Sequence, residues 1–239
     1  DELAYNSHRN LAAAYQAGFF DDLITPYRGL ARDGNLRADT SLEKLATLKP
    51  VFGKNLGADA TMTAGNSTPL TDGASTVLLA SESWADAHDL PKLAAVVDAE
   101  AAAVDFVHGK DGLLMAPVFA VPRLLARQGL TLADIDYFEI HEAFAATVLS
   151  TLAAWEDEEF GRTRLGLDGA LGSVDRSRLN VNGSSLAAGH PFAATGGRIV
   201  ASLAKQLHAK GRTDGRPARG LVSVCAAGGQ GVVAILESL

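Results

Sequence analysis

The chain begins with apolar residues spaced as they are on one face of a helix. Gly18 follows them as a stop signal, so the spacing predicts an amphipathic helix over residues 2–17. A second, shorter helix is predicted between Thr40, which has capping-box spacing to Glu43, and Pro50. The residues of the first helix that recur at steps of three and four are Leu3, Ala4, His8, Leu11, Ala12 and Tyr15.

Farther along the chain, short apolar runs alternate with helical patterns. Residues 55–72 contain few large apolar side chains and are predicted to form a loop, and the polar residues 156–179 are predicted to form a surface excursion. The alternation predicts an α/β layered fold in which helices cover both faces of the central strands. The predicted strands are 75–80, 93–97, 137–140, 221–224 and 232–236, and the predicted helices are 81–87, 118–128, 143–155 and 193–210.

The composition narrows the classes of protein. The chain has 239 residues, of which 47% are hydrophobic and 21% are charged, as in a globular protein with a buried core. The formal net charge of −7 argues against a surface that binds nucleic acid or anionic membranes. No uninterrupted apolar run approaches the roughly 20 residues that span a bilayer.

The single cysteine and the first residues carry further information. One cysteine excludes an intrachain disulfide and a Cys-rich zinc site. It also fits a reducing compartment, so we expect a cytoplasmic protein. The chain starts at Asp1 without an initiator Met and without the basic-then-apolar order of a signal peptide. We therefore expect it to be part of a longer protein.

Three glycine-framed or tight turns carry reactive side chains, and the first contains Gly189-His190-Pro191. Gly189 permits backbone conformations that are closed to other residues, and Pro191 suits the first turn of a helix. We expect the imidazole of His190 to lie on a rigid support near the positive end of a helix dipole, where the neutral base is favoured. The alternative is a histidine that bonds local backbone at the start of a helix.

The second turn follows a predicted strand and contains Cys225 and the segment 226–231, which is made of Ala, Gly and Gln. Such small residues let a ligand or another backbone come close, and consecutive amides can donate to a developing oxyanion. By itself, however, a lone buried cysteine such as Cys225 is more often a small hydrophobic residue than a reactive thiol, and the glycine turn beside it reduces this difference.

The third turn, His141-Glu142-Ala143-Phe144, joins the predicted strand 137–140 to a helix. Two polar side chains at such a junction could hold a water or a substrate oxygen, although Glu142 could equally cap the helix. A metal site is not favoured, because the chain has no His-x-x-x-His pair and no cysteine besides Cys225.

Together the three turns resemble the C-terminal motifs of the thiolase family, and they occur in the family's order. Upstream, residues 63–74 resemble the family's loop that contacts coenzyme A, and residues 39–45 also fit its pattern. The likeness covers essentially the whole chain. The His-Glu-Ala-Phe motif, in place of the commoner Asn-Glu-Ala-Phe, resembles the branch that contains the thiolase subunits of fatty-acid β-oxidation complexes.

Three positions depart from the family's pattern. Ser184 stands where many members have the second Gly of a pair, and Pro69 stands where many have Gly. Both changes bear on local backbone geometry. Thr68 replaces a loop serine that often contacts coenzyme A, but it keeps the hydroxyl.

The resemblance implies an α/β thiolase fold with layers in the order α-β-α-β-α. The chain would contain the C-terminal half, part of the loop domain and the last strand of the N-terminal half. The implied boundaries are residues 1–62 for the remainder of the loop domain, 63–90 for the coenzyme A loop with the last strand and helix of the N-terminal half, and 91–239 for the C-terminal thiolase domain.

The resemblance also implies an acyltransferase that cleaves 3-ketoacyl-CoA, with coenzyme A as co-substrate and no covalently bound cofactor. His190 would activate the nucleophile and donate toward a thioester oxygen, and Cys225 would move the proton at the α-carbon of the substrate. His141 would stand where the family's Asn positions a water of an oxyanion hole. The backbone amide of Ala227 would serve a second oxyanion hole. The residues that would line the coenzyme A and acyl pockets are Ser67, Thr68, Met115 and Phe144.

The nucleophile of thiolases is a second cysteine in the N-terminal half, whereas this sequence contains only Cys225, which by position is the acid–base cysteine. We therefore expect turnover only when the rest of a thiolase is present. One alternative is an inactive coenzyme A-binding or assembly module. Another is a condensing β-ketoacyl synthase, although such enzymes generally lack a cysteine at the position of Cys225. The family implies a homodimer or higher oligomer, and association with a hydratase/dehydrogenase subunit.

Overall fold

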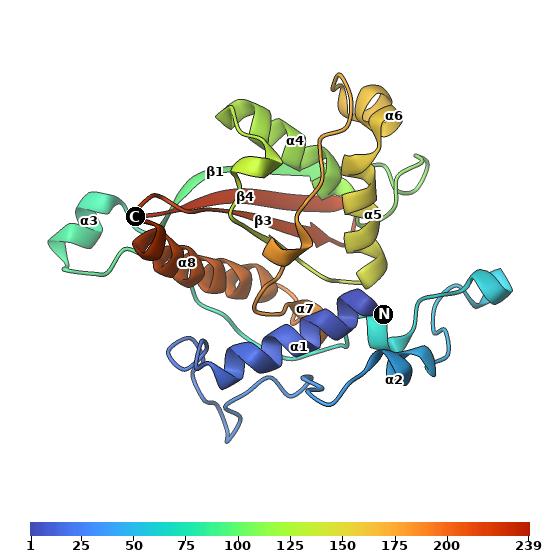
Figure 1. The fold of residues 1–239 in the computed structure, drawn as a ribbon, viewed down its shortest axis with the longest axis horizontal. Helices are drawn as coiled ribbons and strands as arrows, with labels where there is room; N and C mark the ends of the chain where they lie inside the picture. Colours follow the sequence, from blue (N-terminus) through green and yellow to red (C-terminus); the bar gives the residue numbers. More distant parts are fainter. The chain divides into compact units, whose positions relative to one another are not determined.

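The computed structural model describes residues 1–239, which divide into two compact units. Figure 1 shows the helices and strands of both. Helices α5 (Ala145–Glu156) and α8 (Thr195–Asp214) contribute residues to each unit. The first unit consists of Asp1–Ala74, His141–Ser150 and Asn180–Thr195, and the second of Ser75–Ile140, Thr151–Leu179 and Gly196–Leu239.

Helix α1 (Glu2–Gln16) supplies the main core of the first unit, and its bounds confirm the helix predicted over residues 2–17. Its buried face packs against α7 (Ser185–Ala188), a short helix that the sequence pattern does not predict. A second cluster joins α1 to α2 (Leu42–Ala46). The predicted loop over 55–72 is irregular apart from two 3-10 helices, Lys54–Asp59 and Ala64–Asn66. The two clusters contain Leu11, Ala14, Tyr15, Phe20, Ala187 and Ala188, and Ala4, Leu45, Ala145 and Leu186.

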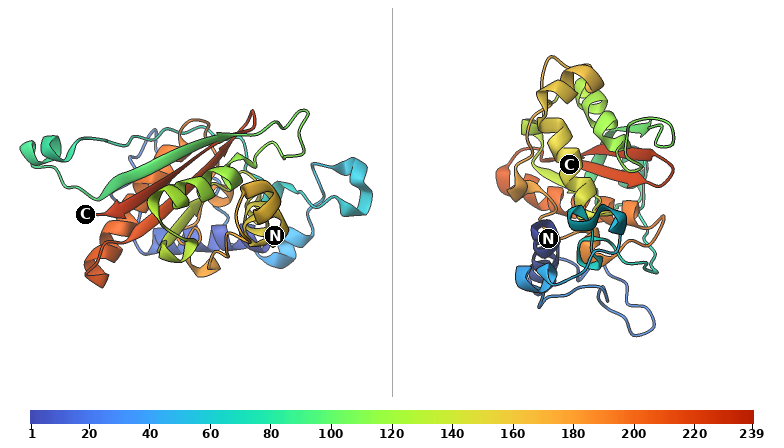
Figure 2. Two further views of the ribbon diagram at one scale, coloured as in Figure 1. Left: turned by 90° about the horizontal axis from the view of Figure 1, so that it is seen from above. Right: turned by 90° about the vertical axis from the view of Figure 1, so that its right-hand side faces the viewer.

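The second unit is built on a four-stranded sheet with the order β1-β4-β3-β2. The pairs β1–β4 and β4–β3 are antiparallel, and the pair β3–β2 is parallel. The long strands run side by side in Figure 1 and in the left view of Figure 2. Four of the five predicted strands are thus confirmed. Their bounds are β1 (Ala94–Ala103), β2 (Tyr137–Ile140), β3 (Arg219–Ala226) and β4 (Gln230–Ser238).

Helices cover both faces of this sheet, as the apolar strands predict. Successive residues of a strand point to opposite faces. Val222 and Leu236 pack against Ile199 and Leu203 of α8. Figure 1 shows α4 (Ala116–Gln128) on the opposite side of the sheet from α8, with α4 in contact with β1 and β4. This double cover explains why β3 and β4 are apolar on both faces.

Side chains of α4 also occupy the free edge of the sheet at β1. Arg127 donates to the carbonyl oxygen of Ala99 at 3.0 Å, and Arg123 donates to that of Ala101 at 3.1 Å. The N–H of Ala99 donates to Asp98 Oδ1 at 2.8 Å, and Asp98 Oδ2 accepts from Arg127 at 2.7 Å. The hydrogen bonds from Arg127 lower the pKa of Asp98 to about 2. Because an open edge invites another strand to pair with it, these bonds close β1 to strand addition.

The strand predicted over residues 75–80 does not form. Leu78 and Leu79 are 70% and 71% exposed, and the segment takes part in no strand pairing. A strand needs a neighbour that accepts its hydrogen bonds, and no strand of the sheet pairs with this segment. The strand predicted over residues 75–80 is therefore wrong, whereas the implied domain boundaries stay a prediction. The helix after it, α3 (Glu82–Ala87), is confirmed, with Ser81 as its cap.

Two helix ends also differ from the sequence prediction. Ser41, not Thr40, caps α2 by accepting the N–H of Lys44 at 3.2 Å. Gly211 does not end α8, which continues to Asp214. A Cβ at Gly211 would lie 2.3 Å from Oγ of Ser238, so this glycine allows α8 to approach β4 closely. The excursion over 156–179 contains α6 (Glu158–Phe160) and one π-helical turn, Gly161–Leu165.

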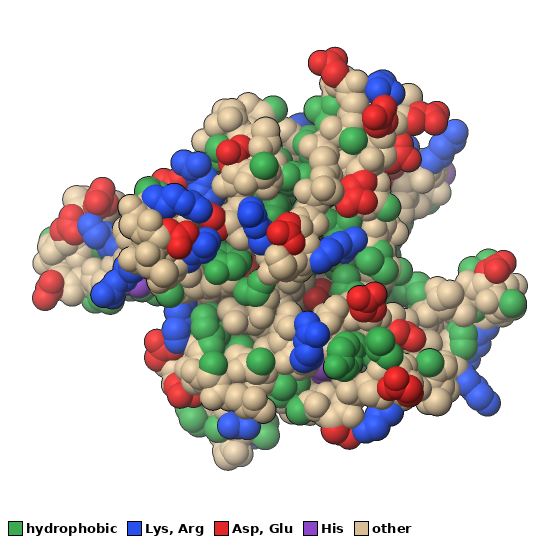
Figure 3. Space-filling model, in the orientation of Figure 1, with side chains coloured by type: hydrophobic (Ala, Val, Ile, Leu, Met, Phe, Trp, Pro, Cys, Tyr) green, Lys and Arg blue, Asp and Glu red, His purple; other side chains and the backbone are tan.

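Acidic and basic side chains are interspersed on the face shown in Figure 3, and neither sign forms a continuous patch there. This agrees with the modest net charge of −7. No helix of the chain has the length and apolar character needed to cross a membrane.

A pair of leucine substitutions tests this account of the second unit. Leu203→Ala should lower the free energy of unfolding by about 2–5 kcal/mol, because Leu203 is fully buried between α8 and the sheet. Leu78→Ala should change it by less than about 0.5 kcal/mol, because that side chain packs against little. Urea unfolding followed by circular dichroism measures both. A large loss for Leu78→Ala would mean that residues 75–80 are packed after all.

Candidate active site

Two histidines from distant parts of the sequence lie side by side in the first unit. His141 directly follows β2, and His190 follows α7 after a single glycine. The centroids of their rings are 4.1 Å apart, and the ring planes are inclined by 42°. The structure therefore brings together two candidate residues that the sequence presents in separate turns.

A serine of α7 holds the ring of His141. This ring is buried, with 1% of the residue exposed, and its Nδ1 lies 2.7 Å from Oγ of Ser185. A hydrogen bond at one ring nitrogen fixes the orientation of an imidazole and the direction of its other nitrogen. Ser185 belongs to α7, so the orientation of the His141 ring depends on the position of this helix.

A threonine orients His190. Its Nδ1 lies 2.6 Å from Oγ1 of Thr195, and the same hydroxyl lies 3.3 Å from the carbonyl oxygen of Pro191. A carbonyl oxygen can only accept, so the hydroxyl donates to Pro191 when it accepts from the Nδ1–H of His190. This arrangement leaves the lone pair of His190 on Nε2, which is the state that a general base requires.

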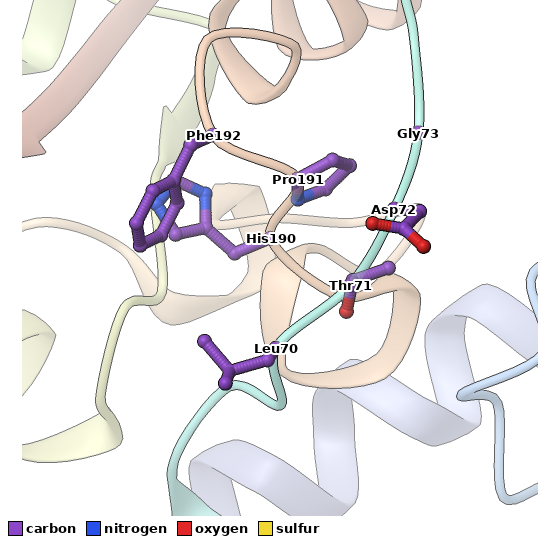
Figure 4. A pocket seen from close by; sticks show the side chains of 7 residues that line it. All are labelled: Leu70, Thr71, Asp72, Gly73, His190, Pro191 and Phe192. Atoms are coloured by element: carbon purple, nitrogen blue, oxygen red, sulfur yellow. The ribbon is translucent and has the colours of Figure 1, made fainter.

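His190 lines an open hollow of about 550 Å³ with the loop residues Leu70–Gly73 (Figure 4). That volume lies within the usual range of small-molecule sites. In Figure 4 the rings of His190 and Phe192 lie next to each other, with centroids 5.0 Å apart. The loop is tied to the histidine by a backbone bridge between Leu70 and His190.

The backbone before His190 requires a glycine, as the sequence predicts. Gly189 has a φ of 99°, and a Cβ there would lie 2.4 Å from Nδ2 of Asn35. The other part of the prediction is wrong, because Pro191 does not start a helix. Helix α8 begins only at Thr195, and Ala193 before it has a left-handed φ of 65°. His190 is instead oriented by a hydroxyl, that of Thr195, which is the first residue of α8.

The predicted coenzyme A loop is anchored to the motif that contains His141. Thr68 donates from its N–H and its Oγ1 to the carbonyl oxygen of Ala143, at 3.1 and 3.0 Å. Ser67 pairs with Phe144 in an isolated bridge, and the ring of Phe144 meets that of Phe52 edge-on at 5.6 Å. Two predicted coenzyme A-binding residues, Ser67 and Thr68, thus lie next to the histidine motif, which itself contains the third, Phe144.

Glu142 has partners that the sequence does not reveal. Its buried carboxylate accepts hydrogen bonds from Ser7, Asn180 and Leu186, so it links three segments of the first unit. No motif marks Ser7. The signal that could have found it is its place on the apolar stripe of α1, four residues after Leu3 and four before Leu11.

The remaining candidates, Cys225, Ala227 and Met115, belong to the second unit. Cys225 lies at the end of β3 opposite Gly231, and Ala227 opens the turn to β4. Met115 is the residue before α4. Burial raises the pKa of the Cys225 thiol to about 11. Such a thiol keeps its proton at neutral pH, which suits a proton donor better than a nucleophile.

Comparisons with known proteins give a consistent result. The chain matches the family model "Thiolase, N-terminal domain" over residues 1–83 and "Thiolase, C-terminal domain" over residues 90–238. It is 41% identical to the 3-ketoacyl-CoA thiolase of Pectobacterium atrosepticum and 42% identical to that of Yersinia pestis. Each alignment covers 99% of this chain and 53% of the relative. The chain thus spans about half the length of the curated relatives it matches.

Solved structures show the same coverage. The chain superposes on human mitochondrial 3-ketoacyl-CoA thiolase in complex with CoA with a TM-score of 0.80 and 34% identity. The dimeric peroxisomal thiolase of Saccharomyces cerevisiae gives a TM-score of 0.81 and 31% identity. Both matches cover 100% of this chain and 54% of the other. They confirm the expected α/β thiolase fold, of which this chain covers about half.

The raised pKa of Cys225 predicts the pH dependence of its alkylation. Only the thiolate reacts with iodoacetamide, so the rate in the folded chain should rise about tenfold per pH unit from pH 8 to 10. In the urea-unfolded chain the rate should level off above about pH 9. Mass spectrometry follows the reaction cleanly because there is one cysteine. A plateau below pH 9 in the folded chain would contradict a raised pKa.

Proposed function

The chain belongs to the thiolase family, and on this premise we propose that it supplies the acid–base machinery for cleaving 3-ketoacyl-CoA with coenzyme A. The observation that carries the proposal is the pair of rings of His141 and His190, which lie 4.1 Å apart. Each ring has one nitrogen next to a hydroxyl. The names of the Pectobacterium and Yersinia relatives support this choice of substrate.

Thiolysis proceeds in two steps. A thiolate of the enzyme first attacks the 3-keto carbon, the bond between C2 and C3 breaks, and the carbanion at C2 takes up a proton to give acetyl-CoA. Coenzyme A then loses its thiol proton, attacks the acyl thioester and leaves as the shortened acyl-CoA, which restores the enzyme's thiolate. The site must therefore supply a nucleophile, a base, an acid and donors to oxyanions.

In this proposal His190 is the base. It accepts the proton of each attacking thiol at Nε2 and, once protonated, donates toward the thioester oxygen. Cys225 is the acid, and its raised pKa keeps the proton available for the C2 carbanion. His141 positions a water in one oxyanion hole, and the amide of Ala227 donates in the other.

The nucleophile is proposed to come from the portion of a thiolase that this chain does not span, because the chain contains only Cys225. Ser67, Thr68, Phe144 and Met115 are proposed to contact coenzyme A or the acyl chain. The anchoring of Thr68 to Ala143 supports this role for the loop. The Saccharomyces cerevisiae relative is described as dimeric, which supports a homodimer here as well.

The presence of only one cysteine favours a second candidate function, an inactive module that binds coenzyme A. The two candidates differ in one observable property. An inactive module binds coenzyme A with or without the rest of a thiolase. The enzyme cleaves 3-ketoacyl-CoA once the nucleophile is present.

Thiolysis is tested on the protein restored to the length of its curated relatives. It should consume acetoacetyl-CoA or a longer 3-ketoacyl-CoA only when coenzyme A is added, as followed by the enolate absorbance. His190→Ala should lower kcat by more than the roughly 10²–10³-fold cost of one oxyanion donor, because a base is lost as well. The chain alone should show no turnover. If adding coenzyme A to the restored protein causes no loss of the enolate absorbance, the proposed thiolase activity is rejected and the inactive coenzyme A-binding module is favoured.

Two substitutions at His141 separate a water-positioning role from other roles. His141→Asn should keep substantial activity, because an amide can also bond Ser185 and hold a water. His141→Ala should lose activity, because no polar atom remains. Steady-state kcat of the restored protein measures both. Equal losses in the two variants would mean that His141 does not act by positioning a water.

A further inference from the structure

We propose that Glu142 is a positioning residue that sets the placement of the His141 and His190 rings through helix α7. The proposal rests on the function proposed for the two histidines, but its first test examines the rings themselves.

Glu142 is a buried carboxylate with donors at both oxygens. The residue is 2% exposed. Oε2 accepts from Oγ of Ser7 at 2.7 Å and from the N–H of Leu186 at 3.1 Å, and Oε1 accepts from Nδ2 of Asn180 at 2.7 Å. A carboxylate only accepts, so it matches this set of donors. An amide of the same size would turn its own NH2 group toward one of them.

These bonds tie the start of α7 to α1. Ser7 lies on α1, and its Oγ also accepts the N–H of Ser184, the residue before α7, at 3.0 Å. Glu142 holds the N–H of Leu186 within the helix itself. Asn180, the third donor, accepts at its carbonyl oxygen from Asn10 of α1 at 3.2 Å. The position of α7 is therefore fixed by Glu142 and by α1 together.

Both histidines are attached to this helix. Ser185 of α7 bonds Nδ1 of His141, and its carbonyl oxygen accepts the N–H of Gly189 at 2.8 Å. His190 follows Gly189 directly. A displacement of α7 thus moves the hydrogen-bond partner of one ring and the backbone of the other.

A helix as short as α7 has no stability of its own. It contains four residues, whereas isolated helices shorter than about 12 residues are marginal in water. Tertiary contacts therefore decide where α7 lies. Apolar packing against α1 is one of them, and the buried carboxylate contributes one hydrogen bond directly and another through Ser7. Without the carboxylate, we expect α7 to shift against His141, which stays attached to the end of β2.

The first test is an NMR comparison of the wild-type chain with the Glu142→Gln variant. The ring 1H–15N signals of His141 and His190 should both leave their wild-type positions, because the donors around residue 142 are no longer all satisfied. The signals of His88 and His108, which lie in the second unit, should stay in place and serve as internal references.

The matched control is Tyr15→Phe on the same helix as Ser7. It removes the 2.7 Å bond from the hydroxyl of Tyr15 to Asp33 and the bond that this hydroxyl accepts from the N–H of Asp33, while the ring can keep its packing in the cluster with α7. Its ring signals for His141 and His190 should match the wild type. Ser7→Ala removes one of the three donors to Glu142 and should shift the same two signals less. This variant decides the question if Glu142→Gln does not fold.

The second test is kinetic and uses the protein restored to the length of its relatives. Glu142→Gln should lower kcat by roughly ten- to hundredfold while KM changes by less than about twofold, because misplaced groups impair the chemical step more than binding. Unchanged ring signals in a folded Glu142→Gln or Ser7→Ala chain, or equal shifts in Tyr15→Phe, would overturn the proposal. If the restored protein has no thiolase activity, the proposed function fails, and the NMR result still decides the role of Glu142.

Discussion

A buried carboxylate needs hydrogen-bond donors at its oxygens, and in the first unit this constraint applies to Glu142. Its donors come from α1, from the segment that begins at Asn180, and from α7. Asn180 and α7 are neighbours in the sequence, but both lie far from α1 and from Glu142, so satisfying the charge brings distant parts of the chain to one place. The two histidines are attached to the same segments. The bonds that stabilise this part of the fold are therefore also the bonds that place the candidate base and its neighbour.

The second unit depends on a different interaction, the burial of apolar surface on both faces of one sheet. Helices α4 and α8 supply this cover, and Arg123 and Arg127 close the sheet edge at β1. Burial of this kind raises the pKa of Cys225, which lies within β3. The property that suits this thiol to donate a proton thus follows from the packing of the sheet and needs no charged neighbour.

Sequence analysis predicts elements whose signal is periodic and local. Helices α1 and α4 and the four strands of the sheet are of this kind, and the structure confirms them. It cannot predict α7, because four residues are too few to show a period. It also fails at residues 75–80, because an apolar run indicates a strand only if another strand pairs with it. Ser7 is missed because its hydroxyl suggests solvent, whereas its position on the stripe indicates burial. The partners of such polar groups are decided by tertiary contacts.

Ser184 shows how a departure from the family's pattern is accommodated. Its φ of −145° lies outside the left-handed region that favours glycine, so the sign of φ does not require a glycine here. The N–H of Ser184 bonds Ser7, but its buried Oγ has no hydrogen-bond partner. A buried hydroxyl in that state costs about 1–3 kcal/mol. The cost falls on the residue just before α7, so it weakens the segment that Glu142 and Ser7 hold in place. Because the hydroxyl of Ser184 has no hydrogen-bond partner, the donors gathered around the Glu142 carboxylate matter more for the placement of both histidines.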